Sequence, residues 1–367
     1  MSLTPRPTPT STGLGRRAVL GAGTAAGIGA VLAACSTGPA GDTGSGDTGS
    51  GEGGDAEPAE GAYPRTITHA LGETTLETAP ERIATISWVN PDTVLALGIV
   101  PVGMDAVTWG GNENQSTDWI DAKVEELGGQ TPALFSTTDG LDTDAIAAST
   151  PDLIVAAYSG LDQEQYDALT AIAPTIAYPE GSGPWSTSWQ DSLTLVGEAL
   201  AQEDEAQRVI EDVESQMQAV AEENPSLEGT TFLFATLDPA AADQISLYTD
   251  ADNRPKFLET LGMQNAPVVQ ENAGDDGAFF ITWSPERADE LESDLLVAWF
   301  NDEAALETVL ADPLLSRIPA IENDHFLPQT DQMQALSISA ASALSIPWAL
   351  ETVMPQIIEV ADSASAE

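Results

Sequence analysis

Two stretches of the chain decide the fold: "DAIAASTPDLIVAAY" (residues 144–158) and "ERADELESDLLVAWF" (residues 286–300). They align without a gap at an offset of 142 positions (286 − 144 = 142). Each opens on an acidic residue, carries a second acid eight positions later (Asp152 and Asp294), and continues as an apolar run to an aromatic residue. This pattern predicts a helix, a turn and a buried strand in both places. We therefore expect two lobes of similar construction; chance similarity between two βα units is the alternative.

Strand and helix patterns alternate from residue 63 onward, except in the middle of the chain. A hairpin pattern turns near Gly72, a strand pattern spans residues 81–88, and further apolar strands alternate with amphipathic helices. This alternation predicts a parallel sheet with crossover helices in each lobe. Near the end of the chain Pro347 lies within a helical pattern, where it is expected to bend or break the helix.

The middle of the chain, residues 186–227, has helix patterns only. Residues 203–224 predict a single helix about 33 Å long. Its apolar stripe consists of Val209, Val213, Met217 and Val220. We therefore expect an α/β fold in which two Rossmann-like lobes, residues 63–185 and 228–361, are joined by a long rigid helix, with a ligand cleft between the lobes.

The charge of the chain is strongly negative, with 11 lysines and arginines against 59 acidic residues and a formal net charge of −48. A surface of this sign repels nucleic acids and anionic lipids, because both are bound through basic residues that neutralise phosphates. We therefore expect no nucleic-acid partner. Adaptation to a salty or exposed setting and attraction of cationic ligands are the two explanations that stay open.

The N-terminal 35 residues have the layout of an export signal. Arg16 and Arg17 precede an uncharged run of small and apolar residues, and residues 32–35 read "LAAC". That ending resembles the bacterial lipobox, after which the cysteine is lipidated, and the arginine pair resembles a twin-arginine signal. Cys35 is thus expected to attach a lipid anchor on the outer face of the cell membrane, with an uncleaved N-terminal anchor as the alternative. Residues 36–62, rich in Gly, Ser, Thr and acids, predict a flexible tether.

Residue types for catalysis or metal binding are scarce. The chain has two histidines, His69 and His325, and no cysteine other than Cys35. A multi-histidine metal site is therefore not expected. Neither a GxSxG nor a GxxxxGK[ST] pattern occurs, so a serine hydrolase and a P-loop enzyme are also not expected. We expect a binding protein without a cofactor rather than an enzyme.

Aromatic residues gather at strand ends and in the loops that follow them. In open parallel sheets, ligands bind beyond the carboxyl ends of the strands, and aromatic walls suit a bulky, partly apolar ligand. The aromatic residues expected at the ligand are Trp88, Trp109, Tyr158, Trp185, Tyr248 and Trp283. Core packing is the alternative for each tryptophan, and Trp299, inside the repeated strand, is expected in the core. Arg254 is expected either to pair with a neighbouring acid or to hydrogen-bond ligand oxygens.

Several segments, taken in order, resemble one protein family. The lipobox, "ERIATISW…LALGIVPVG", "TPDLIVAAYSG" with "IAPTIAYPE", the helical middle and "FLETLGM" are similar to the iron-siderophore substrate-binding lipoproteins of bacterial ABC importers. The resemblance covers roughly residues 63–361. It implies a ferric siderophore bound between two αβ lobes, with the iron saturated by the siderophore itself. We further expect a monomer whose lobes move little, because a long helix is stiffer than loop hinges.

The same resemblance assigns a role to the first acid of each repeated stretch. In this family one surface carboxylate on each lobe docks onto arginines of the membrane permease, and the matching positions are Asp144 and Glu286. The usual residue is Glu in both lobes, so Asp144 departs from the pattern with a shorter side chain. A charge favoured at a helix N-terminus is the alternative for both residues.

Two other functions share some of these features. One is the same fold binding cobalamin or haem, and a haem site usually has an axial His, Tyr or Met. The other is a cell-surface adhesion or enzyme module that takes no transported ligand. The sequence does not separate hydroxamate, catecholate and citrate siderophores, although a net charge of −48 favours neutral or cationic complexes.

Overall fold

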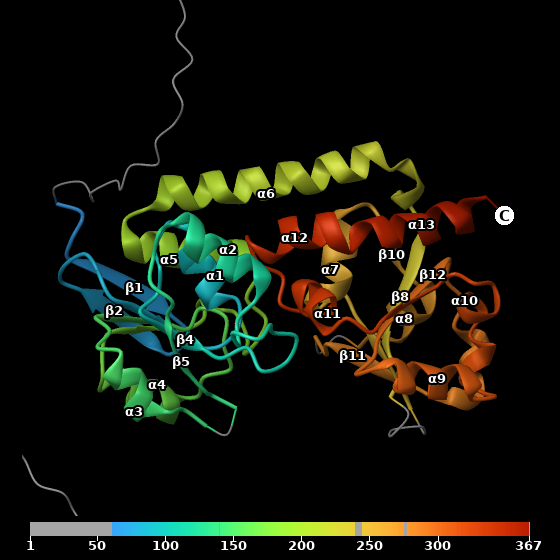
Figure 1. Cartoon of the computed structure of the whole chain (residues 1–367), viewed down its shortest axis with the longest axis horizontal. Helices are drawn as coiled ribbons and strands as arrows, with labels where there is room; N and C mark the ends of the chain where they lie inside the picture. Colours follow the sequence, from blue (N-terminus) through green and yellow to red (C-terminus); the bar gives the residue numbers. More distant parts are fainter. Residues whose placement is uncertain (1–60, 139, 239–243, 275–276, 367) are drawn as a thin grey trace, which may run out of the picture. The chain divides into compact units, whose positions relative to one another are not determined.

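The computed structural model describes residues 61–138, 140–238, 244–274 and 277–366 (Figure 1). The expected signal segment with Cys35, and residues 36–60 of the expected tether, lie outside these ranges. Within them, no helix is both long enough and apolar enough to cross a membrane. Figure 1 shows two groups of strands and helices side by side along one long helix, α6 (Glu203–Glu223).

The N-terminal lobe is built on a five-stranded parallel sheet preceded by the expected hairpin. The strand order is β5-β4-β3-β6-β7, so the direction of winding reverses between β3 and β6. The strands are β1 (Arg65–His69), β2 (Gly72–Leu76), β3 (Ile83–Thr85), β4 (Gly103–Asp105), β5 (Ala133–Phe135), β6 (Leu153–Val155) and β7 (Thr175–Ile176). The helices are α1 (Asn90–Ala96), α2 (Asp118–Glu126), α3 (Thr143–Ala148) and α4 (Gln163–Thr170). The loops after β3 and β6 diverge at the reversal, which is where open α/β sheets bind ligands.

The first strand of this sheet is shorter than the sequence predicts. β3 ends at Thr85, although the strand pattern continues to Trp88. Ser87 and Val89 have φ angles of 74° and 67°, and a β-strand cannot contain a positive φ. The chain therefore leaves the sheet after Ile86 and presents Trp88 in the loop before α1.

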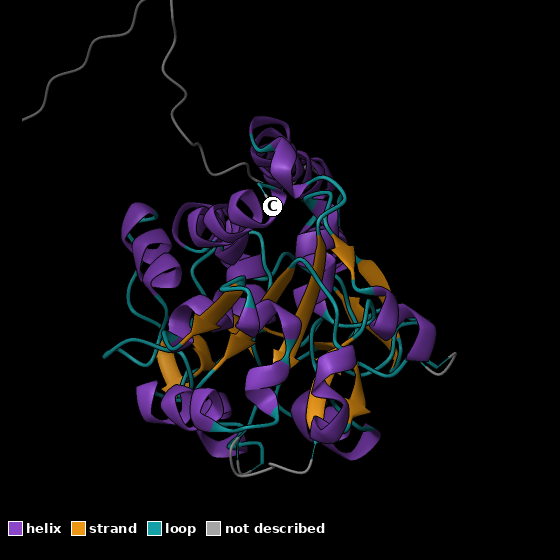
Figure 2. Cartoon of the chain, turned by 90° about the vertical axis from the view of Figure 1, so that its right-hand side faces the viewer, coloured by secondary structure: helices purple, strands orange, loops and turns teal. Residues whose placement is uncertain are grey.

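The C-terminal lobe is built on a six-stranded sheet that is mixed rather than purely parallel. β8, β10, β12 and β13 are parallel, whereas β9 is antiparallel to both β8 and β11, so β11 runs in the direction of β8. The end view shows helices on both sides of the strands (Figure 2). The strands are β8 (Thr231–Thr236), β9 (Ile245–Tyr248), β10 (Gln264–Asn265), β11 (Phe280–Trp283), β12 (Leu295–Trp299) and β13 (Phe326–Gln329). The helical segments are α7 (Asn253–Thr260), α8 (Pro267–Asn272), η3 (Pro285–Glu290), α9 (Glu303–Ala311), η4 (Leu315–Arg317), α10 (Pro319–Glu322), α11 (Gln332–Ser339), α12 (Ser345–Thr352) and α13 (Met354–Ser365).

The two repeated stretches occupy equivalent places in the two sheets. Asp152 precedes β6, and its carboxylate accepts hydrogen bonds from the backbone N–H groups of Glu81 (2.9 Å) and Arg82 (2.8 Å), at the start of β3. Asp294 precedes β12 and accepts from the backbone N–H of Thr231 (2.8 Å), at the start of β8. In each lobe the second acid of the repeat thus secures the start of the neighbouring central strand. The repeat therefore reflects a shared construction of the two sheets.

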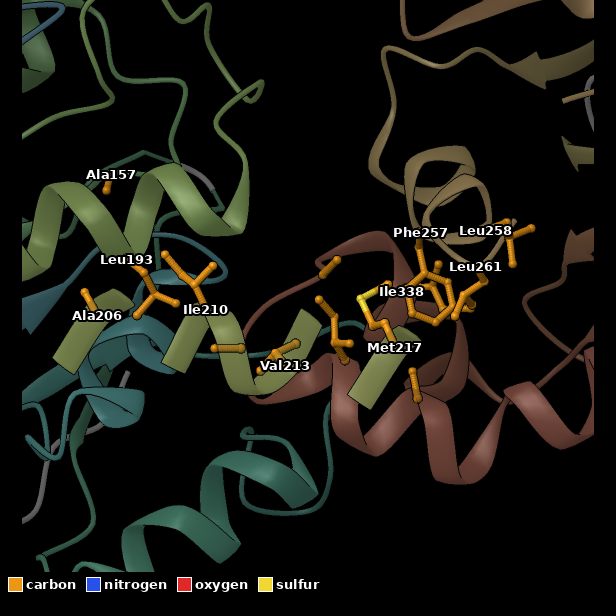
Figure 3. Close-up of a cluster of buried hydrophobic side chains, with 14 of the residues drawn as sticks. Ala157, Leu193, Ala206, Ile210, Val213, Met217, Phe257, Leu258, Leu261 and Ile338 are labelled. Atoms are coloured by element: carbon orange, nitrogen blue, oxygen red, sulfur yellow. The ribbon is translucent and has the colours of Figure 1, made fainter. Parts of the chain in front are cut away.

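Helix α6 shares one continuous hydrophobic core with both lobes (Figure 3). Ile210 lies beside Leu193 of α5 (Trp189–Leu200) at one end of the core, and Met217 lies near Phe257 and Ile338 at the other. From Ile210 to Met217 is two turns of the same helix, so both contacts are made by one rigid element. Moving the lobes far apart would expose this core to water, which is unfavourable.

The apolar stripe of α6 agrees closely with the prediction. Val213 and Met217 are buried, and Val209 and Val220 are partly buried against the same core. The helix ends at Glu223, one residue before the predicted end, and the 3₁₀ turn η1 (Pro225–Leu227) leads into β8. Acidic residues fill the first turn of α6, where the helix dipole favours negative charge.

The expectation that Pro347 breaks a helix is wrong. Pro347 is the third residue of α12, and the first N–H groups of a helix have no partner within it, so a proline costs little there. The helical pattern instead ends between α11 and α12, after Ser339, and again at Val353 between α12 and α13.

Candidate ligand site between the lobes

Trp88 and Tyr158 lie where the winding of the N-terminal sheet reverses, one after β3 and the other after β6. The fully buried Asn90 links them. Its Nδ2 donates to the carbonyl oxygens of Ile86 (2.6 Å), Trp88 (3.0 Å) and Tyr158 (2.9 Å), and its Oδ1 accepts from the backbone N–H of Tyr158 (3.0 Å). These bonds hold the backbone on either side of Trp88 at positive φ, a conformation that costs about 1–3 kcal/mol per residue. The strained loop presents the Trp88 ring to solvent, with 39% of the residue exposed.

Three tryptophans make a contact from one lobe to the other. Trp88 and Trp109, which follows β4, are stacked with ring centroids 6.4 Å apart. Trp109 meets Trp299 of the C-terminal lobe edge to face, with centroids 5.5 Å apart. Trp299 packs on the core as expected, but it is only partly buried, and its contact with Trp109 is one that sequence reasoning missed. Its Nε1 is buried without a hydrogen-bond partner in the described ranges, as is the side-chain amide of Gln329, its neighbour on β13.

Trp185 covers the loop that follows β6. Its ring lies edge to face against Tyr158, with centroids 5.7 Å apart, and its backbone N–H donates to the carbonyl of Ser159 (3.0 Å). A Cβ at Gly160 would lie 2.2 Å from Trp185 Nε1, so the indole can sit there only because residue 160 is glycine. Trp185 has a φ of 63° and remains 45% exposed.

The phenol of Tyr158 is buried at the boundary between the lobes. Burial raises the pKa of Tyr158 to about 12; the negative charge of Asp252 adds to the rise, and the positive charge of Arg254 opposes it. Tyr158 therefore keeps its proton at neutral pH. Its hydroxyl makes no hydrogen bond within the described part of the chain, which leaves it available as a donor to a ligand.

Arg254 lies in the first turn of α7 in the C-terminal lobe, and its positive charge acts on Tyr158. Its guanidinium carbon lies 4.3 Å from the centroid of the Tyr248 ring. Its Nε donates to Ser339 Oγ (2.9 Å), and its Nη1 donates to both carboxylate oxygens of Asp252 (3.1 and 2.9 Å). The expected pairing with a neighbouring acid is therefore present. Nη2 has no partner among the residues described, so a ligand oxygen can still be bound.

Exposed large aromatic residues concentrate at this place. Within the described ranges they are Trp88, Trp185 and Phe280, with exposed fractions of 39%, 45% and 50%. Each is in ring contact with another aromatic of this region, and Phe280 meets Tyr248 at 6.5 Å. Exposed apolar rings next to polar groups mark a binding surface. We refer to the following residues as the interlobe cluster: Trp88, Trp109, Tyr158, Trp185, Tyr248, Arg254, Phe280 and Trp299.

A small pocket beside Trp88 lies between α1, α2 and α11, and its lining includes Asp92, Asp105 and Trp119. Asp92 Oδ1 accepts hydrogen bonds from Trp119 Nε1 (2.7 Å) and from Ser342 Oγ of the C-terminal lobe (2.6 Å). Burial raises the pKa of Asp92 to about 6, against the opposing effect of these two hydrogen bonds. Trp119 also packs on Trp348, with ring centroids 5.2 Å apart. The wall of the pocket therefore ties the two lobes together.

Trp283 is not brought into the interlobe cluster, contrary to the sequence-based expectation. It is 6% exposed and packs in the core on the other side of the C-terminal sheet, and its Nε1 donates to the carbonyl of Arg287 (2.9 Å). Phe280 pairs with Tyr248, and Trp283 comes three residues later on β11. Because side chains alternate along a strand, an odd number of steps places Trp283 on the opposite face.

Both histidines lie in structural surroundings. His69 is buried in β1, with Nε2 3.0 Å from Thr74 Oγ1, and burial lowers its pKa. His325 is buried just before β13, at the amino end of that strand. The described part of the chain also contains no group of three or more His, Cys, Asp or Glu side chains arranged to hold a metal ion.

Asp144 and Glu286 are exposed at the start of α3 and of η3, the latter a 3₁₀ helix. Neither side chain makes a hydrogen bond or ion pair within the described ranges. The N-cap of α3 is Asp142, whose side chain accepts from Ala145 N–H, so Asp144 is not needed for capping. The two acids follow β5 and β11, so each lies beyond the carboxyl end of a strand of its lobe.

Comparison with known proteins identifies one family of binding proteins. The profile of the family described as periplasmic binding protein matches residues 83–330. The ferric enterobactin-binding periplasmic protein of Escherichia coli O6:H1 is 26% identical over 278 residues, which cover 71% of this chain and 82% of that protein. A probable siderophore-binding lipoprotein of Bacillus subtilis is 32% identical over 155 residues, 42% of this chain and 43% of its own.

Solved structures agree with the sequence relatives. PiaA of Streptococcus pneumoniae TIGR4, crystallised in complex with ferrichrome, superposes with a TM-score of 0.73 at 33% identity. The match covers 81% of this chain and 99% of PiaA. PiaA, whose structure contains ferrichrome, thus shares the overall fold of this chain.

Proposed function

The chain belongs to the periplasmic binding protein family, and on that premise we propose that it captures a ferric siderophore at the interlobe cluster and delivers it to a membrane permease. Family membership implies a location outside the cytoplasm. The observation that carries the proposal is the interlobe cluster itself: three exposed aromatic rings that each pack on another ring of the cluster, the strained loop of Trp88 and the guanidinium of Arg254. Large rings with a few directed polar groups suit a bulky, partly apolar metal complex.

Three polar groups of the site can donate hydrogen bonds that no residue in the described ranges accepts. Tyr158 keeps its hydroxyl proton, Arg254 has Nη2 free of protein partners in the described ranges, and Trp299 Nε1 is buried without one. Buried donors without partners are costly, so a bound ligand with oxygen acceptors would recover that cost. Siderophores carry such oxygens around the iron and supply its ligands themselves. The protein then needs only stacking surfaces and hydrogen bonds.

Binding is tested by tryptophan fluorescence of the purified full chain during titration with ferric siderophores, their iron-free forms, cobalamin and haem. We expect saturable quenching by a ferric siderophore at submicromolar concentration and none by its iron-free form. Trp109→Ala should weaken binding at least about tenfold, whereas Trp283→Phe, in the core of one lobe, should not change it. A response to cobalamin or haem alone would keep the fold and replace the ligand, and silence throughout would contradict the proposal.

Delivery is proposed to use Asp144 and Glu286, one exposed acid on each lobe, at matched places in the repeated stretches. Asp144→Ala and Glu286→Ala should reduce siderophore uptake in cells that depend on this protein, while binding measured by fluorescence stays unchanged. Glu164→Ala, at another exposed acid on α4, is the control for surface charge. Uptake that is normal in the Asp144 and Glu286 double variant would refute the docking role.

Attachment to the membrane is proposed to occur through a lipid on Cys35. The segment "LAAC" supports this, and so do the Gly- and acid-rich residues after it. A tether of that composition would connect the folded lobes to a lipid inserted in the membrane. Cys35→Ser should release the protein from the membrane fraction into the medium. Retention of that variant in the membrane fraction would favour an uncleaved N-terminal anchor instead.

A further inference from the structure

We propose that the interlobe cluster selects ferric complexes without negative charge, which makes uncharged or cationic hydroxamate siderophores the cargo rather than anionic catecholates or citrates. The inference rests on the proposed function and names its substrate class. A ferric tris-hydroxamate is uncharged, since three singly charged hydroxamates balance the ferric ion, whereas a ferric tris-catecholate carries three negative charges. An anionic cargo needs uncompensated positive charge where it binds.

In the described part of the chain, almost all of the positively charged side chains lie outside the interlobe cluster. Of the eight lysines and arginines in those ranges, Arg254 is the one in the interlobe cluster. Five of the other seven pair with acids: Arg65 with Glu203, Lys123 with Glu126, Arg208 with Glu205, Arg287 with Glu290 and Arg317 with Asp289. Arg82 donates to the carbonyls of Ser149 and Thr150, and Lys256 to the carbonyl of Ala251, outside the residues of the interlobe cluster.

The charge of Arg254 is already balanced. Asp252 holds its Nη1 with both carboxylate oxygens, and the two side chains are 16% and 14% exposed, so water screens the pair poorly. Arg254 therefore acts on a ligand as a donor of directed hydrogen bonds with little net charge. Its remaining Nη2 suits a carbonyl or hydroxamate oxygen.

The other ionisable groups at the site add negative charge only. Asp92 and Asp105 line the pocket beside Trp88; Asp92 accepts from Trp119 and Ser342, and Asp105 accepts from Thr137. Neither has a cationic partner in the described ranges. The π faces of the surrounding rings also attract cations and repel anions. A trianionic complex would therefore bind next to partly buried groups that carry the same, negative, charge.

The test is a fluorescence titration of the full chain with three ferric complexes: ferrichrome (uncharged), ferrioxamine B (cationic) and ferric enterobactin (trianionic). We expect saturable binding of at least one of the first two, and binding of ferric enterobactin about 100-fold weaker or worse, because the negative charges of the complex and of the site repel each other. If ferric enterobactin binds as tightly as the others, the charge inference is overturned and the proposed function stands. If no ferric complex binds, the proposed function itself fails.

The variant Asp252→Asn tests the structural reason. It removes the charge that balances Arg254 yet keeps an oxygen to cap α7, since the Asp252 side chain accepts from the backbone N–H of Arg254 and Asn caps equally well. Binding of ferric enterobactin relative to ferrichrome should improve about tenfold. Asp250→Asn, at an exposed aspartate nearby, should leave that ratio unchanged. An unaltered ratio in Asp252→Asn, with a normal unfolding midpoint, overturns the assignment to this pair.

Discussion

The substitution Asp92→Asn examines the tie between the lobes. Asp92 is 4% exposed, and its Oδ1 receives both the Trp119 indole N–H and the Ser342 hydroxyl. Asparagine keeps an oxygen at that place with nearly the same shape, so both hydrogen bonds survive. The change therefore removes the buried negative charge and its titration while leaving the contact between α1 and the C-terminal lobe in place.

The expected effect follows from the pKa of Asp92, which burial raises from 3.8 to about 6. The folded state then binds the proton more tightly than the unfolded chain does. The stabilisation from this group is complete below a pH of about 3.8 and is lost as the pH rises through about 6. The difference between the two pKa values corresponds to about 3 kcal/mol at neutral pH and above. Between a pH of about 7.5 and about 5, wild type should gain about 1.4 kcal/mol relative to Asp92→Asn.

The assay is urea unfolding followed by tryptophan fluorescence at several pH values, with the free energy of unfolding compared between the two proteins. Comparison with the variant is necessary because a chain of net charge −48 also loses self-repulsion as its many acids are protonated. Asp250→Asn, which removes an exposed charge, should give a curve parallel to that of wild type. Parallel curves for wild type and Asp92→Asn would show that Asp92 is not a buried titrating group and would refute this account of the lobe contact.

Three further outcomes are expected. Met217→Ala should lower the free energy of unfolding by about 2–5 kcal/mol in urea titrations, because it opens a cavity where α6 packs on the C-terminal lobe; a loss below 1 kcal/mol would contradict the shared core. Gly110→Ala should lower the thermal midpoint and weaken ligand binding, because φ is 70° and a Cβ would lie 2.6 Å from the carbonyl of Gln332; unchanged binding would mean that this loop approaches α11 less closely. Asp152→Ala and Asp294→Ala should each cost about 1–3 kcal/mol in unfolding free energy, and markedly unequal losses would argue against equivalent roles in the two lobes.

Much of the fold was predictable because its signals are local. Hydrophobic periodicity over 21 residues identified α6, and turn residues identified the β1–β2 hairpin. The repeat of residues 144–158 at 286–300 identified the second lobe, since the same hydrogen-bonding task recurs at Asp152 and Asp294. Local signals were weaker for strand ends. Trp88 leaves the strand because of backbone strain that the apolar pattern does not reveal.

The candidate site was predictable only in outline. Aromatics at strand ends identified Trp88, Trp109, Tyr158, Trp185 and Tyr248, which the structure does bring to the lobe boundary. Trp283 was misassigned, Trp299 was expected only in the core, and Phe280 was not singled out. The pairing of β11 with β9 would have corrected two of these, since it fixes which residues share a face. Asn90, which holds the Trp88 loop, carried a weak signal in its place just before Pro91.

The sequence by itself determined the two lobes, the helix between them, the poverty in metal-binding side chains and the surplus of negative charge. Each of these is a property of composition or of neighbours along the chain. The tertiary structure decided which groups meet: Asp92 with Ser342, Trp109 with Trp299, and Tyr158 with the charges of Asp252 and Arg254. Those partners lie far apart in sequence, and their contacts, burial and pKa values follow from the packing of two lobes on one helix. No local pattern encodes that packing.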